Sequence, residues 1–154
     1  MTEHERTEVP FRRSLQAKVL VGVLKADFAE QVEALRAAAK WLGGSAGPSA
    51  VNRLASRNIC AFTVCPPHGA ELTEPEIEFA IRSYLDLGIP LALYQLPQVT
   101  RNEMAPELVY AAALKYDNFV LFKDTSGTDQ VALYRKRRGD VCLLRGAEGD
   151  YARW

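Results

Sequence analysis

The sequence has few of the residues that bind metal ions. Three cysteines and two histidines occur among its 154 residues. The cysteines (Cys60, Cys65 and Cys142) are odd in number and match no zinc-site spacing. His4 and His68 are far apart in the sequence and have no ligand cluster near them. We therefore expect no metal and no cofactor, and we interpret the cysteines as buried, reduced thiols of a cytoplasmic protein. For Cys65 this interpretation is left open, because this cysteine ends a predicted strand.

The sequence also lacks an excess of charge of one sign. Lysine and arginine together number 19, as do aspartate and glutamate. This balance provides no global field to attract nucleic acid or an anionic membrane. The one dense basic run, residues 135–138, closes a predicted helix, where cations interact favourably with the helix dipole. No segment is long enough to span a bilayer, and the polar N-terminus contains no apolar signal core. We expect neither nucleic acid nor a membrane as a partner.

What the sequence does contain is an alternation of apolar runs and helical patterns. Its length fits one domain with a substantial core. The runs predict strands over 19–24, 59–65, 91–96, 118–123 and 141–144. The intervening patterns predict a helix after Asp27, one between Thr73 and Gly88, and helices over 104–116 and 129–138. This order predicts an α/β fold of parallel βα repeats with right-handed crossovers.

In such a fold, functional residues gather at the C-terminal ends of the strands. Cys65, Tyr94, Lys123 and Arg145 all occupy such positions. Strand alternation further predicts that Phe119, Leu121 and Lys123 share one face, as do Pro90, Ala92 and Tyr94.

Lys123 is the most informative of these residues. It ends an apolar run, where an isolated ammonium is costly. Desolvation favours the neutral amine, which can attack a carbonyl and form a Schiff base. The alternative is that the side chain extends past the strand end into solvent. The following Thr125 and Ser126 are interpreted as caps of the next helix.

Three short motifs follow one another in the second half of the chain, at 94–97 (YQLP), 106–107 (PE) and 122–127 (FKDTSG). In this order and spacing they resemble the dihydrodipicolinate synthase and N-acetylneuraminate lyase family. The members of that family are pyruvate-dependent class I aldolases built on a (β/α)8 barrel. The resemblance extends over about 19–151 and is most specific over 91–129.

The resemblance implies a lyase or aldolase acting on pyruvate or a related 2-keto acid and an aldehyde. Lys123 would form the imine, and Tyr94 would relay protons while the carbon–carbon bond is made or broken. His68 stands where the family has a second relay tyrosine, although a solvent-facing loop histidine is the simpler interpretation. Arg101 lies two residues beyond the place of a substrate-binding arginine, and Arg145 is a further substrate-binding candidate.

The resemblance covers only part of the family's barrel. A complete barrel has eight strands in about 250 residues, whereas the resemblance covers strands three to seven. We therefore expect an incomplete TIM barrel of about five strands over 18–154, preceded by a poorly structured lead-in or helix end over 1–17. The Gly-Thr-Thr-Gly motif of the second strand is missing. A catalytically silent keto-acid-binding or scaffold subunit, or a fragment, is the alternative.

Two apolar sheet edges, 19–24 and 141–144, predict a homo-oligomer or association through these edges.

Overall fold

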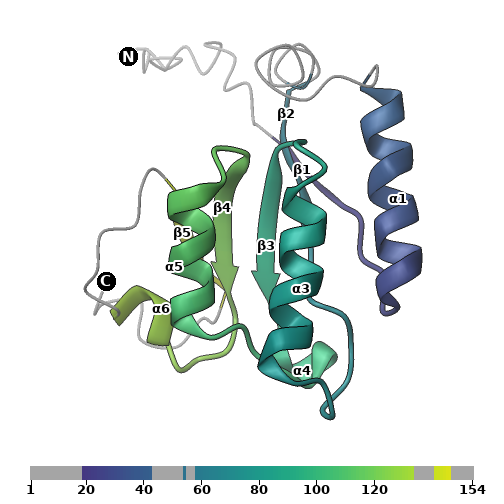
Figure 1. The fold of residues 1–154 in the computed structure, drawn as a ribbon. Coiled ribbons are helices and arrows are strands. Elements are labelled where there is room, and N and C mark those ends of the chain that lie inside the picture. The colour runs from purple at the N-terminus through teal and green to yellow at the C-terminus, as the bar shows by residue number, and fades with distance from the viewer. Residues whose placement is uncertain (1–18, 43–53, 55–57, 134–140, 147–154) are drawn as a thin grey trace, which may run out of the picture.

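Five parallel strands form one sheet in the chain order β1-β2-β3-β4-β5 (Figure 1). The computed structural model describes residues 19–42, 54, 58–133 and 141–146. The strands are β1 (Val19–Gly22), β2 (Ile59–Val64), β3 (Leu91–Gln95), β4 (Phe119–Asp124) and β5 (Cys142–Arg145). All neighbouring pairs are parallel, so each connection crosses back over the sheet. The predicted α/β fold of parallel repeats is therefore confirmed.

Three longer helices and two short ones are described between the strands. They are α1 (Phe28–Trp41), α3 (Glu74–Leu85), α4 (Pro97–Thr100), α5 (Pro106–Lys115) and α6 (Gln130–Leu133). The backbone N–H of Glu30 donates to the Asp27 carboxylate at 3.0 Å, which caps α1, the helix predicted after Asp27. At the start of α3, the backbone N–H and hydroxyl of Thr73 donate to the Glu76 carboxylate at 2.8 and 2.7 Å. These hydrogen bonds lower the pKa of the Glu76 carboxyl.

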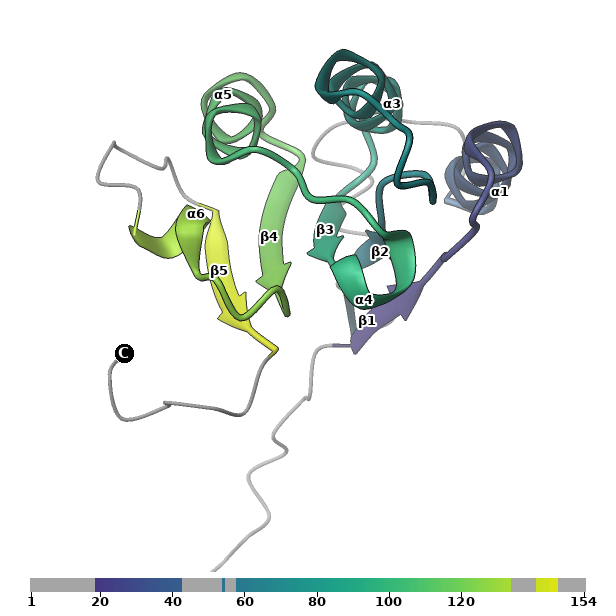
Figure 2. The ribbon, with the colours of Figure 1, turned by 90° about the horizontal axis from the view of Figure 1, so that it is seen from below.

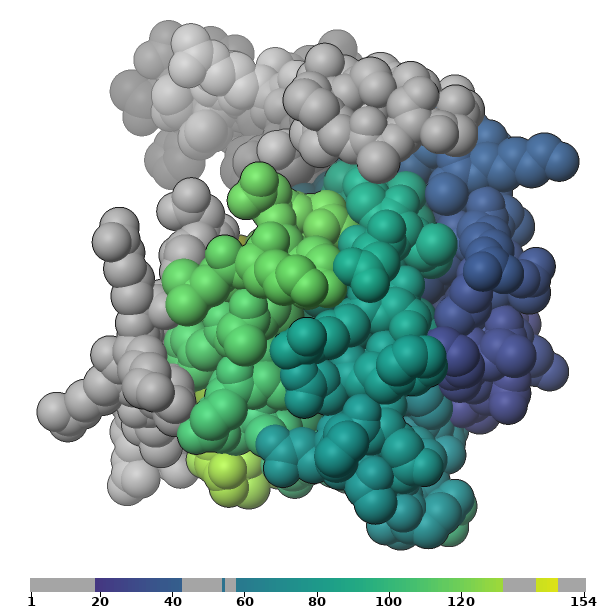
Figure 3. Space-filling model, viewed as in Figure 1, coloured from purple at the N-terminus to yellow at the C-terminus, as the bar shows by residue number. Residues whose placement is uncertain are grey.

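The helices and the sheet form two layers. Seen from below, α1, α3 and α5 lie side by side along one face of the curved sheet (Figure 2). The same three helices form a continuous surface in the space-filling view (Figure 3). The core between the layers contains fully buried side chains from both, including Leu35 of α1, Ile81 and Tyr84 of α3, and Phe122 of β4. Burial of this helix-facing side supplies most of the apolar stabilisation.

The other side of the sheet, which we call the inner face, has a much smaller apolar cluster. It consists of Ala61, Ala92 and Leu121, with Leu20 and Val120 packed against them. Ala92 and Leu121 are register partners in the β3–β4 pair. Tyr94 and Lys123 lie two residues further along the same strands, so they face the same side. The fold thus positions both predicted catalytic side chains on the inner face.

Several predicted boundaries differ from those in the structure. Strand β1 ends at Gly22, although Val23 still donates to the Thr63 carbonyl at 2.9 Å. The sequence did not predict α4, which begins at Pro97, a residue suited to a first helical turn. Asp129 has a left-handed φ of 55°, so α6 begins one residue later than predicted. The predicted lead-in over 1–17 and the end of the last helix lie outside the described residues. No helix of the described part is long and apolar enough to cross a membrane.

The buried side of α3 gives a direct test of the two-layer core. We expect Leu85→Ala, at a position only 1% exposed, to lower the free energy of unfolding by about 2–5 kcal/mol through the cavity it leaves. Leu114→Ala is the matched control, because Leu114 on α5 is 67% exposed and its truncation should cost far less. Urea unfolding followed by circular dichroism measures both. Equal losses in the two variants would contradict the described packing.

Candidate active site

Tyr94 and Lys123 are the centre of the candidate site. The β3–β4 register pairs the two residues directly, and the Lys123 Nζ atom lies 4.1 Å from the centroid of the Tyr94 ring. Both side chains are half-buried. An ammonium at this distance from an aromatic face makes a cation–π contact. The structure therefore brings together the two residues that the sequence singled out. Phe119 does not share their face as predicted, because it packs into the helix-side core next to an irregularity in the β3–β4 register.

A hydrogen-bonded clamp holds the strand ends beside this pair. The backbone N–H and the hydroxyl of Thr125 both donate to the Gln95 carbonyl, at 3.0 and 2.6 Å. The Gln98 side-chain amide in turn donates to the Thr125 carbonyl at 2.8 Å. Thr125 therefore fastens the end of β4 to the end of β3 instead of capping the next helix, which corrects the sequence interpretation. Ser126 does not cap that helix either, since its hydroxyl contacts Thr128 within the turn.

Two buried groups flank the clamp on the same strands. The Gln95 side-chain oxygen accepts a hydrogen bond from the backbone N–H of Met104 at 2.8 Å, which fixes the start of the α5 connection. Asp124 is 5% exposed, and its carboxylate accepts from the backbone N–H of Ser126 at 2.8 Å. Burial, and next the negative charge of Asp124, raise the pKa of the Glu103 carboxyl. Sequence reasoning missed Gln95 as a site-forming residue, because the role of its side chain depends on a loop nine residues away.

Cys65 follows β2 and is only 3% exposed. Burial raises the pKa of its thiol to about 11, and the positive charge of Lys123 only partly opposes this effect. A thiol that stays protonated at neutral pH is a poor nucleophile. The structure thus favours the interpretation of Cys65 as a buried thiol, whereas Cys142 is exposed, which corrects its predicted burial.

Arg145 ends β5, but its guanidinium is engaged by a carboxylate. Its Nε and Nη2 atoms lie 3.1 and 3.0 Å from the two carboxylate oxygens of Asp129. Both side chains are largely buried, at 9% and 17% exposure, which makes this a two-point ion pair of the kind arginine forms well. Arg145 therefore joins β5 to the turn before α6.

The other two substrate-binding candidates are His68 and Arg101. The backbone N–H of His68 donates to the Ala26 carbonyl at 2.9 Å, which joins the loops after β2 and β1. Arg101 follows α4 with a left-handed φ of 60°. It lines a hollow of about 330 Å³ with Asn102 and Glu103, and neither Tyr94 nor Lys123 lines that hollow. The structure thus pairs Lys123 with Tyr94 but does not bring Arg101 to them.

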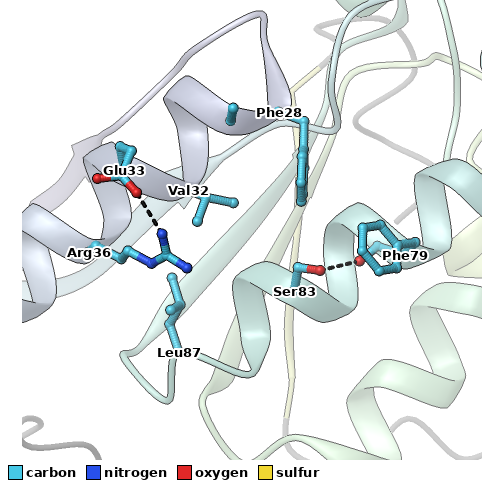
Figure 4. Close-up of a pocket in the computed structure, with 8 residues that line it drawn as sticks. Phe28, Val32, Glu33, Arg36, Phe79, Ser83 and Leu87 are labelled. Atoms are coloured by element: carbon cyan, nitrogen blue, oxygen red, sulfur yellow. Dashed lines mark hydrogen bonds and ion pairs between the residues drawn. The ribbon is translucent and has the colours of Figure 1, made fainter.

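A second hollow, of about 400 Å³, lies on the helix side of the molecule between α1 and α3 (Figure 4). Phe28 and Phe79 line it, with their ring centroids 5.7 Å apart. The Arg36–Glu33 ion pair, 2.6 Å long, closes one side. This hollow is lined by helix residues and not by the strand ends that carry Lys123. Among the described residues, no group of three or more His, Cys, Asp or Glu side chains could hold a metal ion.

Comparison with known proteins gives a match in structure but not in sequence. No protein-family model and no curated protein match the sequence. Dihydrodipicolinate synthase from Thermotoga maritima aligns with a TM-score of 0.63 and 18% identity, over 84% of this chain and 40% of that one. The enzyme from Cyanidioschyzon merolae, solved with lysine bound, gives 0.62 and 22%, over 84% and 39%. The 2-keto-3-deoxygluconate aldolase from Picrophilus torridus gives 0.58 and 19%, over 82% and 41%.

These matches confirm the predicted fold class and the structural resemblance. The chain has the fold of part of a (β/α)8 barrel of the dihydrodipicolinate synthase type. It spans between 39% and 41% of the length of these solved structures. At identities of 22% or less, the similarity establishes the fold and leaves the chemistry to be argued from the site.

The environment of Cys65 predicts a difference in reactivity between cysteines. With iodoacetamide at pH 8, we expect the exposed Cys142 to be alkylated rapidly and Cys65 at least tenfold more slowly, because its thiolate is disfavoured and its sulfur is buried. Peptide mass spectrometry measures the two rates, and the same reaction in urea is the control in which the difference should vanish. Equal rates in the folded protein would contradict the described site.

Proposed function

We propose that this chain is the imine-forming part of a class I aldolase-type lyase, in which Lys123 reacts with pyruvate or a related 2-keto acid. The observation that carries the proposal is the contact between the Lys123 Nζ atom and the Tyr94 ring, at the C-terminal ends of two adjacent parallel strands. Active sites of (β/α)8 barrels lie at this end of the strands. The aldolase and synthase names of the structurally similar proteins support the same chemistry.

The proposed reaction begins at the keto carbon. After giving up a proton, the Lys123 amine attacks this carbon and forms a carbon–nitrogen bond, and the keto oxygen leaves as water after accepting protons. The resulting iminium withdraws electrons from the adjacent carbon. Loss of a proton there gives an enamine that adds to an aldehyde, and the reverse direction breaks the same carbon–carbon bond. Tyr94 relays the protons of these steps, because a positioned phenol can both donate and accept.

The surroundings of the pair support this assignment of roles. Cys65, the other nucleophilic side chain near the lysine, has a raised pKa and remains a thiol. Arg145 is held by Asp129, and Arg101 lines a separate hollow. We therefore assign neither arginine to the substrate carboxylate. We propose that the chain associates through its sheet edges, β1 and β5, with itself or with another polypeptide.

The lysine assignment predicts a covalent adduct. With pyruvate and sodium borohydride, the iminium carbon accepts hydride, and we expect a stable adduct on Lys123 in peptide mass spectra. Lys123→Ala should give no adduct at this peptide. Lys115→Ala on α5, whose lysine is exposed, is the matched control and should trap as the unaltered chain does. An undiminished level of trapped pyruvate in Lys123→Ala would overturn the assignment.

The relay role predicts a separable effect of the Tyr94 hydroxyl. Tyr94→Phe retains the ring beneath the lysine and loses only the proton-transferring group. We expect a roughly 10²- to 10⁴-fold slower exchange of the pyruvate methyl protons with deuterated water, the range typical of lost acid–base catalysis. Proton NMR follows this exchange. An unchanged exchange rate would contradict a relay at Tyr94.

The exposed edges predict self-association. Val19 on β1 and Leu144 on β5 are 51% and 42% exposed, and an unpaired apolar edge is a template for another strand. Size-exclusion chromatography with light scattering should show species larger than the 17.1 kDa monomer. Leu144→Lys, which puts a charge on the edge, should shift the distribution toward monomer. A single monomer peak for the unaltered chain would refute association through the edges.

A further inference from the structure

Gly146 lies where the lysine side chain passes the end of β5. Its backbone N–H donates to the Asp124 carbonyl at 2.6 Å, so the β4–β5 pairing continues one residue beyond the strand. Its backbone does not need a glycine. Positive φ angles occur among the described glycines at Gly69, Gly88 and Gly127, and Gly146 is not one of them. Conformational freedom, the usual reason for a glycine in a turn, therefore does not explain this position.

The lack of space for a side chain explains the glycine at position 146. A Cβ atom at position 146 would overlap the Thr125 Cγ2 atom and lie 3.0 Å from the Lys123 Cε atom. Carbon atoms that are not bonded to each other pack at about 3.5–4.0 Å. A side chain here would therefore overlap the threonine methyl group severely and crowd the lysine stem. The two residues that exclude it are the proposed nucleophile and the clamp residue of β4.

Thr125 has little freedom to move aside. Its hydroxyl and its backbone N–H both donate to the Gln95 carbonyl, and its own carbonyl accepts from Gln98. Turning the methyl group away from position 146 would break the 2.6 Å hydroxyl bond. Any atom added at position 146 thus strains the β3–β4 junction, where the lysine meets the Tyr94 ring.

We infer that Gly146 is a positioning residue for Lys123: its missing side chain leaves room for the Thr125 methyl group, so that the lysine stem extends over Tyr94. The catalytic consequence of this placement rests on the proposed function of Lys123. The placement itself can be measured without any substrate.

The first measurement uses protein with ¹³C-labelled lysine. Protons of the Lys123 ε-methylene, beside an Nζ atom that lies over the Tyr94 ring, should be shifted upfield by the ring current. The signal is assigned by its loss in Lys123→Ala. We expect Gly146→Ala to remove the shift and Gly146→Ala/Thr125→Ser to restore it, because serine retains the hydroxyl and lacks the clashing methyl group. Gly22→Ala is the matched control, since a Cβ there meets nothing within 4 Å.

The second measurement is the rate of borohydride-trapped adduct formation at increasing pyruvate concentration. We expect Gly146→Ala to lower the maximal rate by about ten- to hundredfold, as a nucleophile displaced by about 1 Å would. The half-saturating pyruvate concentration should change little, because Gly146 does not touch the substrate. The double variant should approach the rate of Thr125→Ser alone, and Gly22→Ala the rate of the unaltered chain.

These outcomes distinguish the proposed function of Lys123 from the positioning role of Gly146. An upfield lysine signal without any adduct in the unaltered chain contradicts the proposed function but not the placement. Retention of the signal and of the adduct rate in folded Gly146→Ala overturns the role of Gly146, as does a double variant that remains as impaired as the single one. If Gly146→Ala does not fold, the double variant decides: agreement with Thr125→Ser in both measurements supports the inference, and disagreement overturns it.

Discussion

The site depends on the pairing of β3 with β4. This register sets Tyr94 beside Lys123, and the Gln95 carbonyl accepts two hydrogen bonds from Thr125 just beyond the pair. In a parallel sheet, a shift by one residue would turn every side chain of a strand to the opposite face. The lysine would then enter the helix-side core, where its charge would be buried among apolar groups. The clamp at the strand ends and the large core on the helix side both oppose such a shift.

The two faces of the sheet have different tasks. The helix side buries the large residues that stabilise the fold, whereas the inner face carries the small residues Ala61 and Ala92 beneath the half-buried Lys123–Tyr94 pair. Polar groups at the same strand ends have specific partners: Arg145 pairs with Asp129, and one Asp124 carboxylate oxygen accepts from the Ser126 amide.

The sequence was sufficient to predict the five strands, with ends that differ from the observed ones by one or two residues, because each strand is a short apolar run. It also predicted that Tyr94 and Lys123 end consecutive strands, and the β3–β4 register in the structure then pairs the two residues directly. It could not predict contacts formed across loops. The Arg145–Asp129 ion pair joins residues 16 apart, and the Thr125–Gln95 clamp joins residues 30 apart. Thr125 was therefore assigned to helix capping, a local role that its residue type suggests. The reason for glycine at 146 is likewise a contact with Thr125 and Lys123, and nothing local in the sequence reveals it.

Isotope-edited NMR tests the proposed imine between Lys123 and a 2-keto acid at the bond itself. The chain is labelled with ¹⁵N at the lysine Nζ atoms and mixed with pyruvate labelled with ¹³C at the keto carbon. We expect one protein-bound carbon signal with a one-bond coupling to nitrogen, absent in Lys123→Ala. Lys123 does not form the imine if only free pyruvate and its hydrate are seen at saturating concentration, or if the coupled signal persists without Lys123.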